Sequence, residues 1–297
     1  GRISKVSCDD FARSWKKGKR FSDFLDSLPN ILAARDIQKV IERIVAAYEN
    51  KRGVLFGMGA HVIKVGLNPI VVDLMKRGVI NAVAMNGAGI VHDLELAMMG
   101  RTSEDVATSL KDGTFGMARE TSVFLGEAIQ KAGDTAMGLG ESVGRSIADK
   151  NLPFRDQSIL ATGYRLGIPV TVHIAIGTDI VHLHPDFNPG AAGSASHMDF
   201  RIFASVIADL EGGVYLNVGS AVILPEVFLK AVTLVRNLGH RLENFTTVNM
   251  DFIRHYRPTV NVVNRPTAGG GEGFNLIGHH EIMVPIIAAG IIERIDT

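Results

Sequence analysis

Hydrophobic and polar positions along the chain follow two spacings, one typical of helices and one typical of buried strands. Over residues 36–50 the apolar side chains recur three and four positions apart, which predicts an amphipathic helix. Further helices are predicted at 68–77, 117–132, 140–149, 155–166, 197–210, 225–238 and 281–292. Short apolar runs predict strands at 53–57, 82–85, 169–174, 213–217, 245–250 and 260–263.

This alternation predicts an α/β fold, with a parallel sheet covered by helices on both faces. Asn68, followed by a proline, is expected to cap the helix at 68–77. The turn-rich segments 184–196 and 266–273 follow candidate strands and are expected to be flexible loops beside a ligand site. No repeat or linker interrupts the pattern. We therefore expect one domain over 1–297, with an N-terminal helical extension over about 1–50.

Composition narrows the classes of function. The 31 basic and 31 acidic side chains give a formal net charge of zero, which argues against a nucleic-acid binder that neutralises phosphates. The only cysteine is Cys8, which excludes an internal disulfide and favours a reducing, cytoplasmic setting. The longest apolar run, 282–292, is too short to span a membrane, and the first residues contain no signal peptide pattern.

The clearest functional signal is the segment that follows the strand at 82–85. Gly87 and Gly89 let the backbone approach a ligand closely, because they have no Cβ. Open parallel sheets bind ligands at the carboxyl ends of their strands, so this segment is expected to contact a cofactor. The candidate contacts are Asn86, Gly87, Ala88, Gly89, His92 and Asp93.

A second glycine turn follows the strand at 53–57. Gly57 and Gly59 supply half of a dinucleotide-binding pattern, without its third glycine, and His61 follows them. Together with the Asn86 segment, this turn predicts a nucleotide-binding cleft. Lys64, five residues beyond Gly59, is expected to contact a phosphate or, if desolvated, to form an imine. A solvated helix lysine is the alternative.

The densest polar cluster lies at 176–186. On a strand, His182 and His184 would share one face. With Asp179 or Asp186 they could bind zinc or another divalent ion, or act as a general base with its orienting carboxylate. A loop of hydrogen-bonded polar residues is a third interpretation. The candidate catalytic residues are Asp179, His182, His184 and Lys64, and the alternative metal ligands are His182, His184 and Asp186.

The start of the last helix is a further candidate site. Helix N-termini have free N–H groups and a positive dipole end, which suit an anion. Gly278 and His279 are therefore expected to face a ligand. Glu281 is either a favourable first-turn acid or, in the metal alternative, a further ligand.

These motifs, taken in order, resemble the deoxyhypusine synthase family and its homospermidine synthase relatives. Segment 87–94 is similar to the family's Ala-Gly-Gly-Val-Glu-Glu-Asp-Leu, and segment 178–184 to its Gly-Asp-Met-Ile-Phe-Phe-His. Gly219 and Ser220 resemble part of its glycine-rich turn near the cofactor. An Arg-Pro pair at 257–258 also matches, and the resemblance covers about 35–295.

The resemblance implies a Rossmann-like, doubly wound parallel sheet, NAD as cofactor, and a homotetramer whose sites are shared between subunits. It also implies transferase chemistry, in which an amine is oxidised with NAD to an imine. An active-site lysine then carries the aminobutyl group to an acceptor. The resemblance adds Gly219, Ser220, Gly278 and His279 to the cofactor-binding candidates.

The chain departs from the family where the polyamine binds. Gapless alignment from the Arg-Pro pair puts Pro266 at the family's lysine, Asn264 at its tryptophan and Val260 at an acid. On the cofactor side, His92 replaces a glutamate. Ammonium groups need carboxylates, so a substrate with its own carboxylate or phosphate fits these residues better than spermidine does.

We therefore expect an enzyme of this fold that uses NAD, or NADP, for transient oxidation of an amine or amino-acid-like small molecule. Group transfer or elimination would follow, and no nucleic acid or membrane partner is expected. Three alternatives stay open. They are a metal-dependent hydrolase or lyase built on His182 and His184, a catalytically inactive nucleotide-binding homologue, and a true deoxyhypusine or homospermidine synthase.

Overall fold

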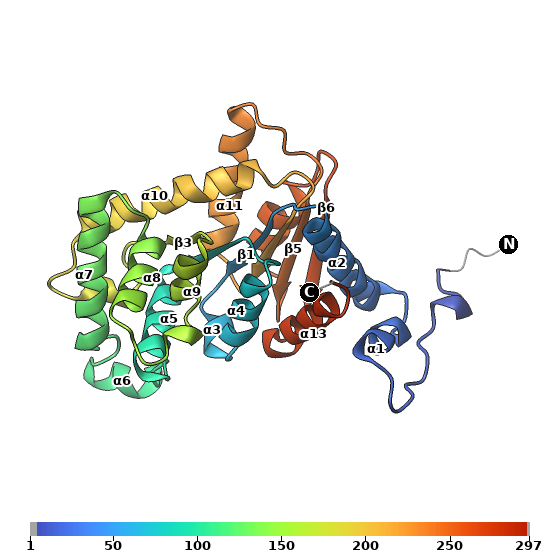
Figure 1. Ribbon diagram of the computed structural model, residues 1–297, viewed down its shortest axis with the longest axis horizontal. Coiled ribbons are helices and arrows are strands. Elements are labelled where there is room, and N and C mark those ends of the chain that lie inside the picture. Colours follow the sequence, from blue (N-terminus) through green and yellow to red (C-terminus); the bar gives the residue numbers. More distant parts are fainter. Residues whose placement is uncertain (1–4, 296–297) are drawn as a thin grey trace.

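The computed structural model describes residues 5–295. Its six strands form one sheet in the order β3-β2-β1-β4-β5-β6, and every neighbouring pair is parallel (Figure 1). The strands are β1 (Val54–Met58), β2 (Ala82–Asn86), β3 (Val170–His173), β4 (Val214–Val218), β5 (Thr246–Asp251) and β6 (Glu272–Ile277). The predicted α/β fold with a doubly wound parallel sheet is therefore confirmed.

Helices connect the strands and cover both faces of the sheet. The α-helices are α1 (Phe21–Ser27), α2 (Leu32–Glu49), α3 (His61–Lys64), α4 (Asn68–Lys76), α5 (Gly87–Met99), α6 (Val106–Asp112), α7 (Arg119–Thr135), α8 (Leu139–Asp149), α9 (Ile159–Leu166), α10 (Pro189–Ala208), α11 (Ile223–Asn237), α12 (Tyr256–Pro258) and α13 (His280–Ile292). Three short 3₁₀ helices are η1 (Cys8–Asp10), η2 (Arg155–Gln157) and η3 (Ile180–Leu183), and η4 (Thr259–Asn264) is a π-helix.

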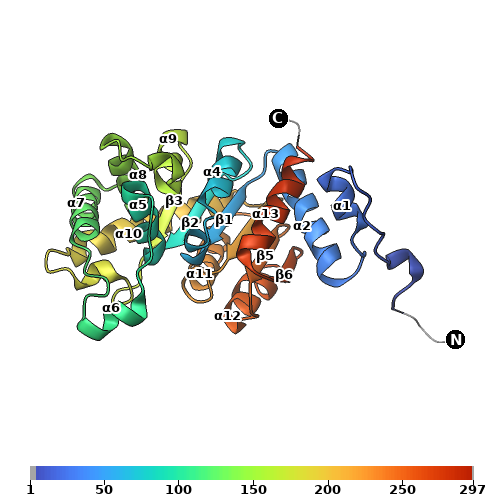
Figure 2. The same ribbon diagram turned by 90° about the horizontal axis from the view of Figure 1, so that it is seen from below.

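Each face of the sheet has its own hydrophobic core. Strand β4 illustrates the division, because Leu216 and Val218 belong to one core and Tyr215 to the other. The larger core packs under α2, α4, α5 and α13 and continues into α7, α8 and α9. The smaller core packs under α10, α11 and η4. Figure 2 brings α4 and α13 to the front of the sheet, with α1 beyond α2 on the side of the N-terminal segment.

The free edge of β3 is covered by side chains from α10. The Val172 N–H donates to Asp199 Oδ2 at 2.8 Å, and the Ser196 hydroxyl donates to the Val172 carbonyl at 2.9 Å. The Ile174 N–H donates to the same hydroxyl at 3.1 Å. An uncovered edge strand is a template for pairing with another chain, and these contacts close it.

Several local predictions are wrong, and packing explains why. Residues 260–263 form part of the π-helix η4, not a strand, because their apolar side chains pack onto α11 and the sheet. The turn-rich segment 266–273 runs into strand β6, and 184–196 enters α10 at Pro189. Leu67, not Asn68, is the N-cap of α4, and the Asn68 side chain is drawn to the buried carboxylate of Asp93 at 2.9 Å.

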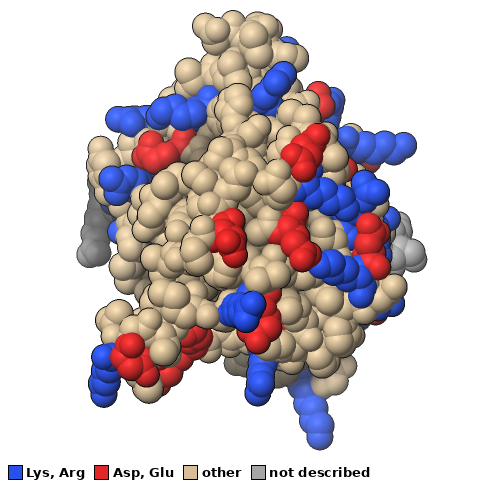
Figure 3. Space-filling view, turned by 90° about the vertical axis from the view of Figure 1, so that its left-hand side faces the viewer, with Lys and Arg blue, Asp and Glu red and all other residues tan. Residues whose placement is uncertain are grey.

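The N-terminal helices and the surface complete the fold. Helix α2 packs against α13 and the sheet, and α1 packs against α13. None of the described helices is long and apolar enough to cross a membrane. Figure 3, which faces the left-hand end of Figure 1, shows Lys and Arg side chains interspersed with Asp and Glu side chains over a largely uncharged surface. The expected single domain over 1–297 stays a prediction.

Candidate functional site

The carboxyl ends of the strands lie at one edge of the sheet, with β1 and β4 adjacent at its centre. The chain leaves these two strands in opposite directions along the sheet, and ligands bind open α/β sheets at such a switch point. A Cβ on Gly59 would lie only 2.1 Å from the Gly219 carbonyl oxygen, and Gly219 has a φ of +67°. The two glycines therefore allow the loops after β1 and β4 to touch.

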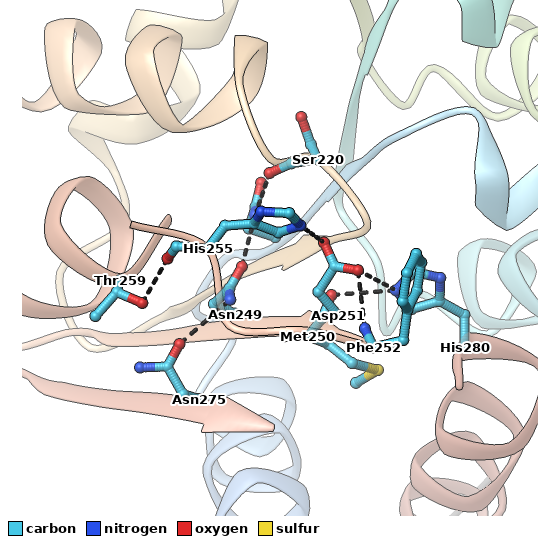
Figure 4. A network of polar contacts seen from close by, with 10 residues as sticks. Ser220, Asn249, Met250, Asp251, Phe252, His255, Thr259, Asn275 and His280 are labelled. Carbon is cyan, nitrogen blue, oxygen red and sulfur yellow. Dashed lines mark hydrogen bonds and ion pairs between the residues drawn. The ribbon is translucent and has the colours of Figure 1, made fainter. Parts of the chain in front are cut away.

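His280, the first residue of α13, lies fully buried beside these loops (Figure 4). Its Nε2 is 3.2 Å from the Met250 carbonyl oxygen, which can only accept, so Nε2 carries the proton and Nδ1 a lone pair. Nδ1 is buried without a hydrogen-bond partner. Burial lowers the pKa of His280, which keeps the ring neutral near pH 7. The ring thus offers an unused acceptor at the switch point.

Asp251, the last residue of β5, lies between two imidazole rings (Figure 4). Its Oδ1 is 3.9 Å from His280 Nε2, and its Oδ2 is 3.8 Å from His255 Nε2. Both distances exceed hydrogen-bond length, so the carboxylate acts on the two rings through its charge. The Phe252 N–H donates to Asp251 Oδ1 at 2.8 Å and holds the carboxylate in place.

Planar side chains lie between the buried ring of His280 and the surface of the protein. The ring centroids of His61 and Phe252 lie 5.4 and 6.1 Å from that of His280. His279 stacks on Phe252 at 6.4 Å with an interplanar angle of 11°. Large apolar side chains are exposed on the same loops and the adjoining strand and helix ends (Val222, Phe252, Ile253, Tyr256, Ile277 and Ile282). Such a gathering is typical of a surface that a ligand or partner covers.

An asparagine ladder crosses the ends of β4, β5 and β6. Asn217 donates to Asn249 Oδ1 at 2.8 Å, and Asn249 donates to Asn275 Oδ1 at 3.2 Å. Asn217 Nδ2 also donates to the carbonyl of Ser220 at 2.8 Å, which fixes the turn after β4. Asn217 Oδ1 is buried without a partner and is a second unused acceptor at this edge.

Asp179 occupies the other half of the edge, beyond β2 and β3. A Cβ on Gly87 would lie 1.9 Å from Asp179 Oδ2, so only glycine lets this carboxylate approach the first residue of α5. The N-terminal end of a helix favours such a negative charge. Burial nevertheless raises the pKa of Asp179, and its Oδ2 has no hydrogen-bond partner.

His182 faces this carboxylate. The Gly177 N–H donates to His182 Nδ1 at 3.1 Å, so Nδ1 accepts and Nε2 carries the proton in the neutral ring. His182 Nε2 is buried without a partner, 4.0 Å from Asp179 Oδ2. The ring packs on Phe187 with centroids 4.6 Å apart. The structure therefore brings together two of the predicted catalytic residues.

His184 is not part of this pair. His182 lies in the 3₁₀ helix η3 and His184 directly follows that helix, so the expectation that the two share a strand face is wrong. His184 Nδ1 lies 3.9 Å from the exposed carboxylate of Asp186. Within residues 5–295, no three His, Cys, Asp or Glu side chains form a group that could hold a metal ion. His182, His184 and Asp186, with or without Glu281, are therefore not assembled as ligands.

Other predicted cofactor contacts on α5 are engaged within the protein. The buried carboxylate of Asp93 accepts four hydrogen bonds, from Asn68, Ser158, Ile159 and Leu160. His92 Nδ1 is 2.7 Å from the Thr102 hydroxyl, which also contacts Glu95. Asn86 caps α5, because its Oδ1 accepts from the Gly89 N–H at 3.1 Å. These contacts fix α5 in place.

The remaining candidates lie at the ends of elements. Lys64 ends α3 and is exposed, without the apolar cover that an imine-forming lysine needs, which leaves it suited to a phosphate contact. The Ser220 hydroxyl accepts from the Leu224 N–H at 3.3 Å, at the start of α11. The Gly278 N–H donates to the Asp251 carbonyl at 3.0 Å. Gly57 leaves room for Tyr215, whose hydroxyl lies 2.5 Å from the position of the absent Cβ.

Pro266, which gapless alignment equates with the family's lysine, lies at the opposite edge of the sheet. Its carbonyl accepts from Arg236 at 2.7 Å, and the same guanidinium donates to Leu242, which precedes β5. The residue at this position is therefore remote from the carboxyl ends of the strands.

Sequence reasoning missed much of the half of the site around His280, which we call the histidine half. It selected His279, whereas the adjacent His280 is the buried residue, and only the packing of α13 distinguishes the two. It also missed Asp251, Phe252 and Asn217. Asp251 had a usable signal, since it directly follows the predicted strand 245–250.

Comparison with solved structures supports the fold. AgrE, in its complex with ornithine and NAD⁺, is 15% identical, with 87% of this chain and 33% of AgrE covered at a TM-score of 0.55. A Methanococcus maripaludis S2 protein provisionally described as LOR/SDH is 14% identical, with 98% of this chain and 74% of that protein covered at a TM-score of 0.53. An Entamoeba histolytica protein provisionally described as a deoxyhypusine synthase is 11% identical, with 95% of this chain and 96% of that protein covered at a TM-score of 0.50.

The chain spans about a third of the length of AgrE. No family model and no curated protein matches the sequence. At these identities the likeness establishes only that the folds are the same. It confirms the deoxyhypusine synthase-like fold that the motifs predict.

Proposed function

We propose that this chain is an NAD-dependent enzyme that acts on an amine or amino-acid-like substrate by group transfer or elimination. The observation that carries the proposal is the position of its unsatisfied polar atoms. Buried polar atoms nearly always have partners, and those without one call for an explanation. Within residues 5–295, eight buried side-chain atoms have none, and four of them lie at the carboxyl edge (Asp179 Oδ2, His182 Nε2, Asn217 Oδ1 and His280 Nδ1).

The histidine half of the edge is suited to a dinucleotide. Phe252, His61 and His279 offer planar faces against which a ring can stack. His280 Nδ1 and Asn217 Oδ1 are acceptors for amide or hydroxyl donors. A bound nicotinamide would supply the hydride acceptor for the oxidation. Lys64 is exposed after β1 and suited to a phosphate, including the additional one of NADP.

Asp179 and His182 are suited to move protons. Asp179 would take a proton from an ammonium or hydroxyl group, because its raised pKa brings it closer to neutral pH. His182, protonated on Nε2 and fixed by Gly177, would orient the same group. Gly87 leaves the space at the start of α5 that the Asp179 carboxylate occupies. Arg254, exposed after β5, is a candidate contact for a substrate carboxylate.

The class of substrate agrees with the structural neighbours. AgrE was solved with ornithine and NAD⁺, and its fold matches this chain at a TM-score of 0.55. Basic amino acids are therefore the first compounds to assay. Group transfer to a protein lysine stays an alternative reaction for the same site.

A thermal-shift titration with NAD, NADH and NADP tests the cofactor. A ligand at 100 times its dissociation constant adds about 2.7 kcal/mol of stability, so a saturable rise in melting temperature is expected with at least one of the three. Phe252→Ala should weaken this shift, whereas His240→Asn, an exposed histidine at the opposite edge, should leave it unchanged. The absence of a shift with all three would refute the proposal.

The homo-oligomer implied by the sequence resemblance stays part of the proposal. Leu110, Met117 and Val123 are exposed on or beside α6 and α7 and are candidates for subunit contacts. Light scattering of the purified chain tests this, and a monomer at all concentrations would refute it.

A further inference from the structure

The gap between Asp179 and His182 has the geometry of a binding site. His182 Nε2 is a donor without an acceptor, and Asp179 Oδ2 is an acceptor without a donor. They lie 4.0 Å apart, too far for a direct hydrogen bond. One bridging atom at about 2.8 Å from each would satisfy both. The side chains of both residues are more than nine-tenths buried, with 6% and 8% exposed.

A cavity of about 10 Å³, measured as space open to the centre of a water molecule, adjoins both side chains. That volume corresponds to about one water molecule. Apart from the two polar side chains it is lined by Gly87, Phe187 and aliphatic side chains that include Ile90 and Leu139. An apolar lining penalises any charged occupant, so a neutral molecule is favoured.

We propose that this gap binds one neutral molecule of the size of water, which accepts from His182 Nε2–H and donates to Asp179 Oδ2. Water and ammonia share this chemistry. An ammonium ion has no lone pair with which to accept, and a halide has no proton to donate. The ammonia source rests on the proposed function, because an elimination from an amine releases ammonia beside Asp179. The water source does not depend on it.

A high-resolution crystal structure of the chain without additives tests occupancy. The expected result is one density peak within hydrogen-bond distance of both atoms. In solution, the His182 Nε2–H signal should be observable by NMR and slow to exchange, because its proton is buried and bonded. An empty gap together with a rapidly exchanging proton would overturn the proposal.

Thermal unfolding at pH 9 distinguishes the two sources. Ammonium chloride is compared with methylammonium chloride at matched free-base concentration and ionic strength. Ammonia binding predicts a melting rise that saturates with ammonia and is absent with methylamine, whose extra carbon does not fit the cavity. Equal effects of the two salts, with the density present, identify the occupant as water.

Two variants connect these readouts to the gap. Asp179→Leu removes the acceptor and should abolish both the density peak and any response specific to ammonia. Asp186→Asn, an exposed carboxylate nearby that pairs with His184, should leave both unchanged. None of these measurements uses a nucleotide or a turnover assay. An empty gap with normal NAD binding would therefore refute this inference alone, and an occupied gap without NAD binding would refute the proposed function alone.

Discussion

Asp93 and Asp179 are buried carboxylates in two regions that meet along α5, and their surroundings differ sharply. Asp93, at the junction of α5 with α4 and α9, accepts four hydrogen bonds. Asp179, at the carboxyl edge of the sheet, leaves Oδ2 without any. Burial raises the pKa of both, so a raised pKa alone does not separate them. The number of satisfied oxygen atoms separates a carboxylate that holds the fold from one that is free to contact a ligand.

The largest expected effect is on turnover. Asp179→Asn keeps the size of the side chain but removes its capacity to take a proton. We expect turnover to fall by roughly 10² to 10⁴-fold, the usual contribution of a general acid or base, while the thermal shift with NAD persists. The measurement is a steady-state assay with the substrate found in the amino-acid screen.

A matched variant makes this result specific. His184→Gln changes a neighbouring side chain that contacts Asp186 instead of Asp179, so its turnover should stay close to that of the parent protein. Normal turnover in Asp179→Asn would remove Asp179 from the mechanism and leave the comparison with Asp93 without functional meaning.

Asp93 should show the reverse pattern, a loss of stability with cofactor binding intact. Asp93→Ala leaves the amides of Ile159 and Leu160 and the side chains of Asn68 and Ser158 without their acceptor. Each buried donor left unpaired costs about 1–3 kcal/mol, so we expect a loss of roughly 3–5 kcal/mol after partial rearrangement. Urea unfolding measures it.

The control for Asp93 is a carboxylate on the surface. Asp73 pairs with Arg77 at 2.8 Å on the outside of α4, and such exposed pairs contribute about 0–1 kcal/mol. Asp73→Ala should therefore change stability little. Equal losses in the two variants would show that the four hydrogen bonds of Asp93 have no special weight.

The sequence predicted five of the six strands, β1 to β5, because buried parallel strands are short apolar runs between amphipathic helices. It also predicted the edge where polar residues gather, since Gly87 and Asp179 both follow strands. It also placed Asp93 at this edge, as a cofactor contact. The local sequence pattern does not indicate that Ser158, 65 residues further along the chain, and the start of α9 donate hydrogen bonds to this carboxylate.

The histidine half could not be read from the sequence for a related reason. The direction of a side chain at a helix start depends on tertiary packing, and that choice separates buried His280 from exposed His279. An atom such as His280 Nδ1 is unsatisfied because no other polar group of the fold lies within hydrogen-bond distance. The local sequence pattern contains no information about this. Residues 260–263 carry strand propensity, yet their packing on α11 and β6 holds them in a π-helix.

Asp199 is an intermediate case, with one oxygen satisfied and the other not. Its Oδ2 accepts from Gly140 and Val172, whereas Oδ1 has no partner, and burial raises its pKa from 3.8 to about 7. Between about pH 4 and pH 7, the folded protein therefore keeps the proton on Asp199, whereas the unfolded chain has released it. Stability from this group is complete below about pH 4 and is lost as the pH rises through about 7.

Asp199→Asn tests that dependence. At about 1.4 kcal/mol per pKa unit, the parent protein should lose about 2–3 kcal/mol more than the variant between pH 5 and pH 8. Urea unfolding at the two pH values measures the difference between the proteins, which cancels the titration of other groups. Parallel pH profiles would mean that Asp199 is ionised in the folded state throughout, and that one satisfied oxygen is enough.

The smallest expected effect concerns an unsatisfied atom below the carboxyl edge. The Tyr215 hydroxyl is buried without a partner, beside the space that Gly57 leaves open, while its ring stacks on Phe228 with centroids 3.9 Å apart. Tyr215→Phe keeps the stacking and removes the unpaired hydroxyl, so we expect a gain of about 1 kcal/mol. Tyr164→Phe, at an exposed ring, serves as control. A loss of stability in Tyr215→Phe would mean that this hydroxyl is bonded to an internal water molecule. The unpaired hydroxyl in the core would then be a satisfied group. Only the unpaired polar atoms at the carboxyl edge, which a ligand can reach, would still indicate a binding site.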